Sequence, residues 1–284
     1  MADATSAIDP DALLTDAGRT VREAAFDVLR SCGMTTLFAN PGSTEIPFLT
    51  ELPGDFEFVL ALHEGSVVGI ASGYAIASGK PALVLLHTAA GLGNAVSALA
   101  NARVNRAPLV VLVGQQDRRH LAQEPFLAGR LQGLAGVYPV WEHQPVRPQD
   151  VPGSILRARH EAETGRGPAL LIVPMDDWLA PAPQPFEITA PARLLRSRAA
   201  DPAAVAELAA LVREARSPAL VVGAGADEPA TWAASRGSPD AGGSGRGGAW
   251  RPAEERPARA GSCSTSAAQT AAGSISSARS AGLR

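Results

Sequence analysis

Short apolar runs, each followed by a turn and a helical pattern, recur up to residue 173. The predicted strands cover residues 34–39, 56–62, 82–87, 109–114 and 169–173. Their side chains do not alternate between apolar and polar, which is typical of parallel strands covered by helices on both faces. The chain is therefore predicted to form an α/β fold, a doubly wound parallel sheet in a three-layer αβα arrangement.

Helical patterns fill the segments around these strands. Residues 20–32 have one apolar face, Thr20 and Glu23 match a capping box, and Gly33 can end the helix. A second helix is expected over residues 44–51, with Ser43 as its N-cap. Residues 88–93 are interpreted as a glycine-rich loop. The remaining helices are expected over residues 65–78 and 94–103, and from about residue 151.

Polar residues follow four of the predicted strands. They are Asn40 to Ser43, His63 with Glu64, His87 with Thr88, and Gln115 with Gln116. The carboxyl ends of parallel strands meet at one edge of a sheet, and ligands bind beyond that edge. A site containing a hydroxyl, a carboxylate, an imidazole and amides is predicted there.

Glu64 stands where an apolar strand turns into an apolar helix. A poorly solvated carboxylate favours its neutral form, so the pKa of Glu64 is predicted to be raised, as at many active sites. The alternative is a glutamate at a helix start that interacts with the helix dipole and reaches water.

Charge and composition exclude several classes of function. A net charge of −3 gives no electrostatic footprint for nucleic acid or an anionic membrane. Two cysteines, Cys32 and Cys263, provide neither a disulfide framework nor a metal-ligand cluster. Residues 1–19 lack the pattern of a signal peptide, and no apolar run approaches a membrane span. A soluble, cytoplasmic protein is expected.

Changes in composition divide the chain. Residues 1–19 are expected to be a loose lead, 20–180 the first domain, and 181–200 a proline-rich linker. Residues 201–231 resemble the start of a second α/β domain, with a helix over 202–215 and a strand over 219–222. Residues 232–284 are too poor in large apolar side chains to form a core. They are interpreted as a disordered tail or as the product of a shifted reading frame, which would leave the chain truncated.

Four segments resemble a known family. They are LFANPGSTEIPFL (37–49), LALHEGSVVGIASGYAIASGKPA (60–82), LHTAAGLGNAVSALANA (86–102) and GPALLIVPMDDW (167–178). They resemble the thiamine diphosphate-dependent decarboxylases, and within them the benzoylformate decarboxylase type. The resemblance extends over roughly residues 20–226 and implies that 20–180 is the pyrimidine-binding domain and 201–231 the start of the middle domain.

The resemblance also implies roles for individual residues. Glu64 matches the cofactor-activating glutamate, whose carboxyl group hydrogen-bonds a pyrimidine ring nitrogen. Ser43 matches a contact to the substrate carboxylate, and its alternative role is a plain N-cap. His87 matches a histidine that transfers protons, and its alternative role is structural. The implied cofactor contacts, besides Glu64, are Asn40, Pro41, Gly42, Gly91, Asn94 and Gln116.

The implied cofactors are thiamine diphosphate and Mg²⁺. In the family a Gly-Asp-Gly segment holds Mg²⁺ and diphosphate, and none occurs in these 284 residues. We therefore expect no metal ligand in this chain and no activity from the chain alone. The full-length enzyme is expected to be a homodimer or homotetramer that decarboxylates a small 2-oxo acid. The alternatives are an acetolactate synthase-like carboligase, a pyrimidine-domain subunit completed by a separate chain, and a noncatalytic protein of the same fold. A nicotinamide dehydrogenase is disfavoured because residues 40–43 lack the glycine fingerprint.

Overall fold

A computed structural model describes residues 18–182 and 200–217. They fall into two units, one ending at Arg196 and the other beginning at Ser197, and each unit is described by itself. The first contains a six-stranded sheet in the order β2-β1-β3-β4-β6-β5, in which every pair of neighbours is parallel. The strands are β1 Thr36–Asn40, β2 Glu57–Leu60, β3 Ala82–His87, β4 Leu109–Gln115, β5 Trp141–His143 and β6 Pro168–Pro174.

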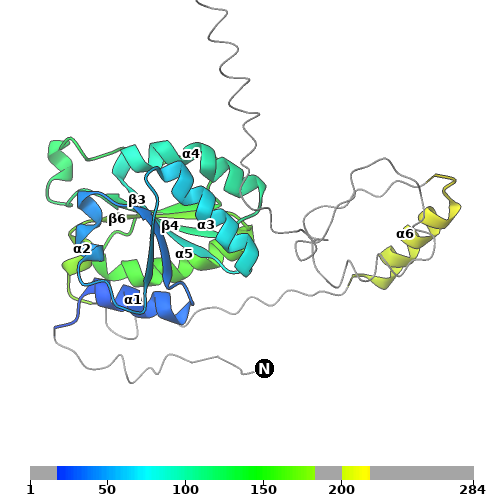
Figure 1. Ribbon diagram of the computed structural model, residues 1–284, viewed down its shortest axis with the longest axis horizontal. Coiled ribbons are helices and arrows are strands. Elements are labelled where there is room, and N and C mark those ends of the chain that lie inside the picture. Colours follow the sequence, from blue (N-terminus) through cyan, green and yellow to red (C-terminus); the bar gives the residue numbers. More distant parts are fainter. Residues whose placement is uncertain (1–17, 183–199, 218–284) are drawn as a thin grey trace, which may run out of the picture. The chain divides into compact units, whose positions relative to one another are not determined.

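Helices cover both faces of this sheet, so the predicted α/β fold is confirmed (Figure 1). Helices α1 and α5 pack together on one face, and α3 and α4 pack together on the other. Each face has its own buried apolar cluster. The helices are α1 Val21–Ser31, α2 Ile46–Leu49, α3 Glu64–Ser78, α4 Thr88–Val104 and α5 Val151–Gly165, with 3-10 turns η2 Ser43–Glu45, η3 Leu121–Gln123, η4 Pro148–Asp150 and η5 Asp177–Leu179.

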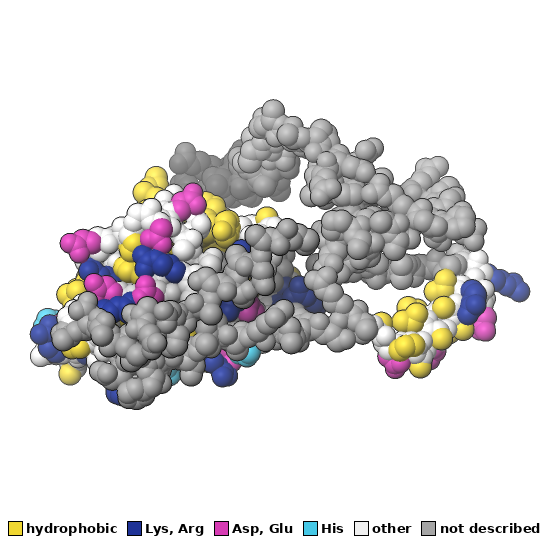
Figure 2. Space-filling view, turned by 90° about the horizontal axis from the view of Figure 1, so that it is seen from below, with side chains coloured by type: hydrophobic (Ala, Val, Ile, Leu, Met, Phe, Trp, Pro, Cys, Tyr) yellow, Lys and Arg dark blue, Asp and Glu magenta, His cyan; other side chains and the backbone are white. Residues whose placement is uncertain are grey.

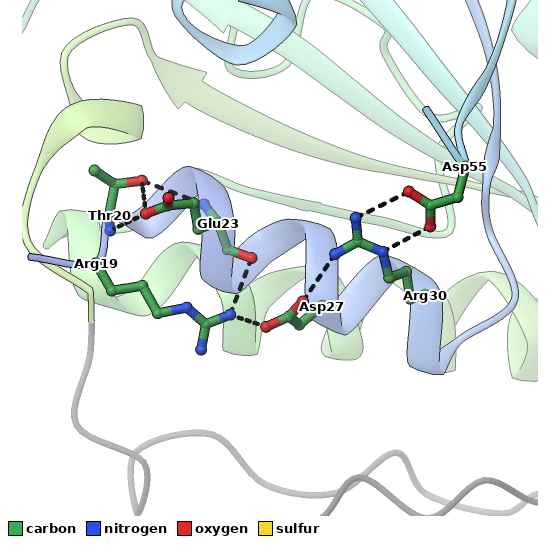
Figure 3. A network of polar contacts seen from close by, with 6 residues as sticks. All are labelled: Arg19, Thr20, Glu23, Asp27, Arg30 and Asp55. Atoms are coloured by element: carbon green, nitrogen blue, oxygen red, sulfur yellow. Dashed lines mark hydrogen bonds and ion pairs between the residues drawn. The ribbon is translucent and has the colours of Figure 1, made fainter. Parts of the chain in front are cut away.

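Helix α1 begins with the predicted capping box (Figure 3). The backbone N–H of Thr20 donates to Glu23 Oε2 at 2.7 Å, and the Thr20 hydroxyl accepts from the backbone N–H of Glu23. Near the other end of α1, the guanidinium of Arg30 donates to Asp27 and to both oxygens of Asp55. The helix is thereby connected at its carboxyl end to the segment that precedes β2 (Figure 3).

The strand at residues 56–62 was expected to be covered on both faces, and this was wrong. Strand β2 lies at the edge of the sheet and pairs with β1 alone. Leu60 is 55% exposed, and Leu62, just beyond the strand, is 89% exposed. Ile70 and Tyr74 on α3 are also exposed. The described residues leave these apolar side chains of β2 and α3 uncovered, and at β2 the reason is that no strand pairs with its outer edge.

The glycine-rich segment 88–93 is helical, not a loop, because α4 begins directly at Thr88. Ala89 and Ala90 are strong helix formers and support this early start. Gly91 faces the side chain of Glu64, where a Cβ would lie 3.4 Å from Glu64 Cγ. The backbone of α4 therefore comes close to the predicted site.

The second unit contains α6, Pro202–Glu214, in agreement with the helix predicted from residue 202. Asp201 caps it by accepting the backbone N–H of Ala203 at 3.0 Å. Apolar side chains lie exposed along this helix (Figure 2): they are Val205, Leu208, Leu211 and Val212. The predicted strand 219–222 and the tail lie outside the described residues. Among the helices that are described, none is both long and apolar enough to cross a membrane.

Phe48 anchors α2 to the core. Its side chain is fully buried, and its ring lies 5.0 Å from that of Phe26 and 4.5 Å from that of Trp178. We predict that Phe48→Ala lowers the free energy of unfolding by about 3–5 kcal/mol, because it opens a cavity and removes two ring contacts. Chemical denaturation followed by far-UV circular dichroism measures this change.

Phe126→Ala is the matched control, since the Phe126 side chain is fully exposed. Its free energy of unfolding is expected to change by less than about 0.5 kcal/mol. Equal effects of the two substitutions would contradict the packing described for α2.

Candidate active site

The carboxyl ends of the predicted strands meet at one edge of the sheet, as expected. Asn40 at the end of β1 pairs with Leu86, and the following residue, His87, pairs with Gly114 of β4. Glu64 follows β2 after three connecting residues and begins α3. This edge therefore brings together side chains that the sequence separates by up to about 75 residues.

Glu64 is buried at this edge, with 8% of its surface exposed. Asn40 Nδ2 donates to Glu64 Oε1 at 2.9 Å, and Asn94 Nδ2 from α4 donates to Oε2 at 3.1 Å. His63 caps α3 through its ring, because His63 Nδ1 accepts the backbone N–H of Gly65 at 3.0 Å. The two carboxylate oxygens are thus held by amides from two different elements.

The pKa of Glu64 is lowered, so the predicted increase was wrong. Burial is the largest single influence and raises the pKa. Hydrogen bonds from its own backbone N–H, from Asn94 and from Asn40, together with the charge of His63, lower the pKa further than burial raises it. The prediction failed because the hydrophobic neighbours of Glu64 in the sequence do not reveal these hydrogen-bond donors. With its pKa lowered, Glu64 is ionised at neutral pH in the free domain.

His87 lies against a second carboxylate. Its Nδ1 is 2.9 Å from Oε2 of Glu45 and 3.0 Å from the hydroxyl oxygen of Thr44. Glu45 is 1% exposed, and its Oε2 also accepts the backbone N–H of Gly42 at 2.7 Å. The hydroxyl of Thr44 donates to the other oxygen, Glu45 Oε1. His87 is therefore anchored by the η2 turn that follows β1.

Three glycines lie beside these groups, and two of them leave space that the side chains need. A Cβ on Gly42 would lie 2.5 Å from the ring of His87, and a Cβ on Gly114 would collide with Glu45 and Thr44. A Cβ on Gly91 would lie 3.4 Å from Glu64 Cγ and 3.6 Å from His87 Cβ. Gly91 therefore lies between the two polar clusters, and Gly42 and Gly114 leave the space that His87 and Glu45 occupy.

Ser43 is not an N-cap, which corrects the alternative role considered for it. The helix expected over 44–51 is split into η2 and α2, and Gly42 precedes η2 without a side-chain cap. Pro47 has no N–H to donate, so an α-helix beginning at Thr44 could not continue through it. The side chain of Ser43 is exposed at the edge of the site.

The remaining predicted contacts are less central. Gln115 Nε2 donates to the carbonyl of Gly129 at 3.0 Å, and Gln115 Oε1 accepts the backbone N–H of Gln116. These bonds organise the loop after β4 and do not reach Glu64 or His87. Pro41 makes no hydrogen bond to either residue. Within residues 18–182 and 200–217, no group of three or more His, Cys, Asp or Glu side chains is placed to hold a metal ion.

The sequence did not reveal the roles of Glu45, Thr44 and Gly114. Glu45 was expected only to lie within the helix predicted over residues 44–51. Its position beside Ile46 and close to Phe48 could have indicated a buried carboxylate, because an acidic residue in an apolar segment is often paired in the fold. Its partner His87 lies 42 residues away and could not be identified from spacing.

Comparisons with known proteins identify the domain. Residues 19–133 match the family model described as thiamine pyrophosphate enzyme, N-terminal TPP binding domain. The chain carries the N-terminal domain of a thiamine pyrophosphate enzyme. The strands β1 to β4 and both polar clusters lie inside the matched part of this TPP-binding domain.

Full-length relatives extend the match. Benzoylformate decarboxylase of Pseudomonas aeruginosa is 44% identical over 211 residues, which is 74% of this chain and 40% of that protein. A mitochondrial acetolactate synthase catalytic subunit of Saccharomyces cerevisiae is 30% identical over 76% of this chain and 33% of its own length. The solved structure of a thiamine diphosphate-dependent 4-hydroxybenzoylformate decarboxylase from Rhodococcus jostii superposes with a TM-score of 0.68 at 41% identity, covering 74% of this chain and 40% of that one. The chain thus spans at most 40% of the length of these three relatives.

The amide donors to Glu64 make a testable prediction for the TPP-binding domain. Asn94→Ala removes one donor, so the pKa of Glu64 is expected to rise. In the parent chain the lowered pKa means that ionised Glu64 stabilises the fold above about pH 4.3, the ordinary unfolded value. This stabilisation is lost as the pH falls through the folded-state pKa. In Asn94→Ala the stabilisation is smaller, because the folded-state pKa lies closer to the unfolded value. Carboxyl ¹³C NMR titration measures both pKa values.

Asn101→Ala is the control, because Asn101 is an exposed residue on the same helix two turns later. It should leave the Glu64 titration unchanged. A Glu64 pKa that does not rise in Asn94→Ala would contradict the hydrogen bonding described here.

Proposed function

We propose that this chain supplies the pyrimidine-binding half of the active site of a thiamine diphosphate-dependent decarboxylase that acts on 2-oxo acids of the benzoylformate type. The observation that carries the proposal is the buried carboxylate of Glu64, held by Asn40 and Asn94 at the strand-end edge of a TPP-binding domain. An ionised and oriented carboxylate in this setting can accept a hydrogen bond, and then a proton, from a protonated ring nitrogen.

The residues present fit the aminopyrimidine part of the cofactor. Glu64 offers an ionised carboxylate that can accept a hydrogen bond from a protonated ring nitrogen. Gly91 places bare backbone beside that carboxylate, where a Cβ would come within 3.5 Å of Glu64 Oε1. A flat ring can approach closely only where no side chain intervenes. Asn40, Pro41, Gly42, Asn94 and Gln116 are proposed as the surrounding contacts.

Thiamine diphosphate, when bound, supplies the electron sink that stabilises the carbanion left by loss of CO₂. The protein's part is to place and move protons. Asn40 and Asn94 fix the two oxygens of Glu64, so that its carboxylate needs little reorganisation to receive a proton. His87, at the end of β3, is the proposed proton-transfer group toward the substrate.

The substrate class follows from the site and the relatives. The hydroxyl of Ser43 is exposed and free of a capping role, so it can donate to a substrate carboxylate. Two of the relatives are a benzoylformate decarboxylase and a 4-hydroxybenzoylformate decarboxylase. An aryl 2-oxo acid is therefore proposed, with Ser43 as its carboxylate contact.

The diphosphate half of the site is proposed to come from outside these 284 residues. They hold no Gly-Asp-Gly segment, so Mg²⁺ and the diphosphate would be bound by another domain. The uncovered apolar face formed by Ile70, Tyr74, Leu60 and Leu62 is suited to burial in a homodimer or homotetramer of the complete enzyme. A cytoplasmic location belongs to the same proposal.

The proposed domain limits are those expected from the sequence. Residues 20–180 form the pyrimidine-binding domain, and 201–231 begin a middle domain of which α6 is the first helix. Residues 1–19, 181–200 and 232–284 are assigned as lead, linker and coreless tail.

Carboligation of the acetolactate synthase type is the second candidate, favoured by the 30% identical yeast relative. Product analysis separates the two functions. A decarboxylase converts benzoylformate to benzaldehyde and CO₂, whereas a carboligase joins two molecules of pyruvate into acetolactate and releases one CO₂. In a further alternative, a separate chain supplies the diphosphate-binding half of the site. Mixing that chain with this one would then give decarboxylase activity.

A chimeric enzyme tests the role of Glu64. Residues 20–180 would replace the corresponding domain of the Pseudomonas aeruginosa relative, and benzoylformate decarboxylation would be followed by a coupled benzaldehyde assay. Glu64→Gln is expected to lower kcat by about 10²–10⁴-fold, because the amide cannot exchange the proton. Glu124→Gln, at an exposed loop position, is the matched control and should retain the parent rate. An unchanged rate in Glu64→Gln would remove the central assignment.

The 284-residue chain by itself is expected to release no CO₂ from benzoylformate when thiamine diphosphate and Mg²⁺ are added. The physical reason is that these 284 residues contain no Gly-Asp-Gly segment, and the described residues contain no group of three or more His, Cys, Asp or Glu placed to hold a metal ion. Release that exceeds the rate of the Glu64→Gln form of the same chain would show that the chain holds a complete site.

A further inference from the structure

Glu45 is a buried carboxylate that the proposed function does not use. It is 1% exposed, and removing such a group from water is costly unless the protein supplies hydrogen bonds. Here the protein supplies three donors. They are the backbone N–H of Gly42, the hydroxyl of Thr44 and the ring of His87.

The contacts around His87 determine which ring nitrogen carries the proton. The Thr44 hydroxyl has one hydrogen, and it is donated to Glu45 Oε1. Its oxygen can therefore only accept from His87 Nδ1, which lies 3.0 Å away. The carboxylate of Glu45 also only accepts. Both neighbours of Nδ1 are acceptors, so Nδ1 must be the N–H donor.

We propose that Glu45 is a positioning residue that holds His87 in its Nδ1–H tautomer and leaves Nε2 as the atom that exchanges protons with the substrate. The assignment of Nε2 to the reaction rests on the proposed function. The tautomer itself rests only on the contacts of His87. In neutral imidazole the second nitrogen is then a free acceptor, which can take a proton and later return it.

The surrounding backbone restricts the ring further. Gly42 lies so close to the His87 ring that a Cβ there would come within 2.5 Å of it. Gly114 leaves the space that Glu45 and Thr44 fill. Thr88, the next residue, has a positive φ of 43°, an unfavourable conformation for a β-branched residue. Strain of this kind persists where the neighbouring structure enforces it, often at functional sites.

The tautomer can be measured directly in the 284-residue chain. Long-range ¹H–¹⁵N correlation spectra of ¹⁵N-histidine-labelled protein distinguish protonated from unprotonated ring nitrogens. The chain has five histidines, and His87→Asn identifies the His87 signals by their loss. In spectra recorded over a pH series, we expect the neutral form of His87 to carry its proton on Nδ1 and none on Nε2. An Nε2–H tautomer in the parent chain would overturn the proposal without any further variant.

Glu45→Gln tests the positioning role. The amide replaces the carboxylate at the same size but loses the charge-assisted hydrogen bond, and it can donate as well as accept. The Nε2–H tautomer, which free histidine prefers, should then become populated at His87. Gly153→Ala is the control, because a Cβ there meets no atom within 4 Å. It should leave the spectrum of His87 unchanged, and an Nδ1–H tautomer retained in Glu45→Gln would overturn the role of Glu45.

The chimeric enzyme adds a kinetic measurement that separates this inference from the proposed function. Glu45→Gln is expected to lower kcat by about 10²-fold with little change in KM, because substrate contacts remain while proton transfer is impaired. An unchanged kcat in a chimera that Glu64→Gln inactivates would overturn the inference alone. An Nδ1–H tautomer at His87 in a domain whose chimera never decarboxylates would support the tautomer and count against the proposed function.

Discussion

A carboxylate buried at the end of a parallel sheet must receive from the protein the hydrogen bonds it would otherwise make with water. At Glu64 two asparagines provide them, one from the end of β1 and one from α4. This requirement links the elements of the site, because Asn40 and Asn94 meet one carboxylate only if α4 begins directly after β3 and lies against α3. Gly91 of α4 lies beside the same carboxylate.

The site contains a second buried carboxylate with a different partner. Amides surround Glu64, whereas Glu45 is paired with the imidazole of His87 and with a hydroxyl. Amides orient a carboxylate without competing for its proton, and an imidazole is itself a proton carrier. Gly91 lies close to both Glu64 and His87, of which Glu64 follows β2 and His87 ends β3, on either side of β1. One edge of the sheet thereby holds two acid–base groups with distinct surroundings.

Local patterns predicted much of this fold. The capping box at Thr20, the order of strands and helices along the chain, and the meeting of four strand ends follow from periodicity and from the geometry of parallel sheets. The errors have identifiable causes. Apolar composition does not show that β2 is an edge strand, and Pro47 interrupts a helix that Ser43 was expected to cap. The apolar neighbours of Glu64 suggested a raised pKa, because its hydrogen-bond donors are distant in the sequence.

The sequence by itself determined the class of fold, the place of Glu64 at a strand-to-helix turn, and the resemblance to thiamine diphosphate-dependent enzymes, because each depends on residues close together in the chain. Only the tertiary structure decided which groups meet. Asn94 reaches Glu64 across 30 residues, and His87 reaches Glu45 across 42. These contacts depend on strand order and on backbone spacing at glycines. Neither property leaves a periodic signal in the sequence, and both decide which hydrogen bonds Glu64 and His87 make.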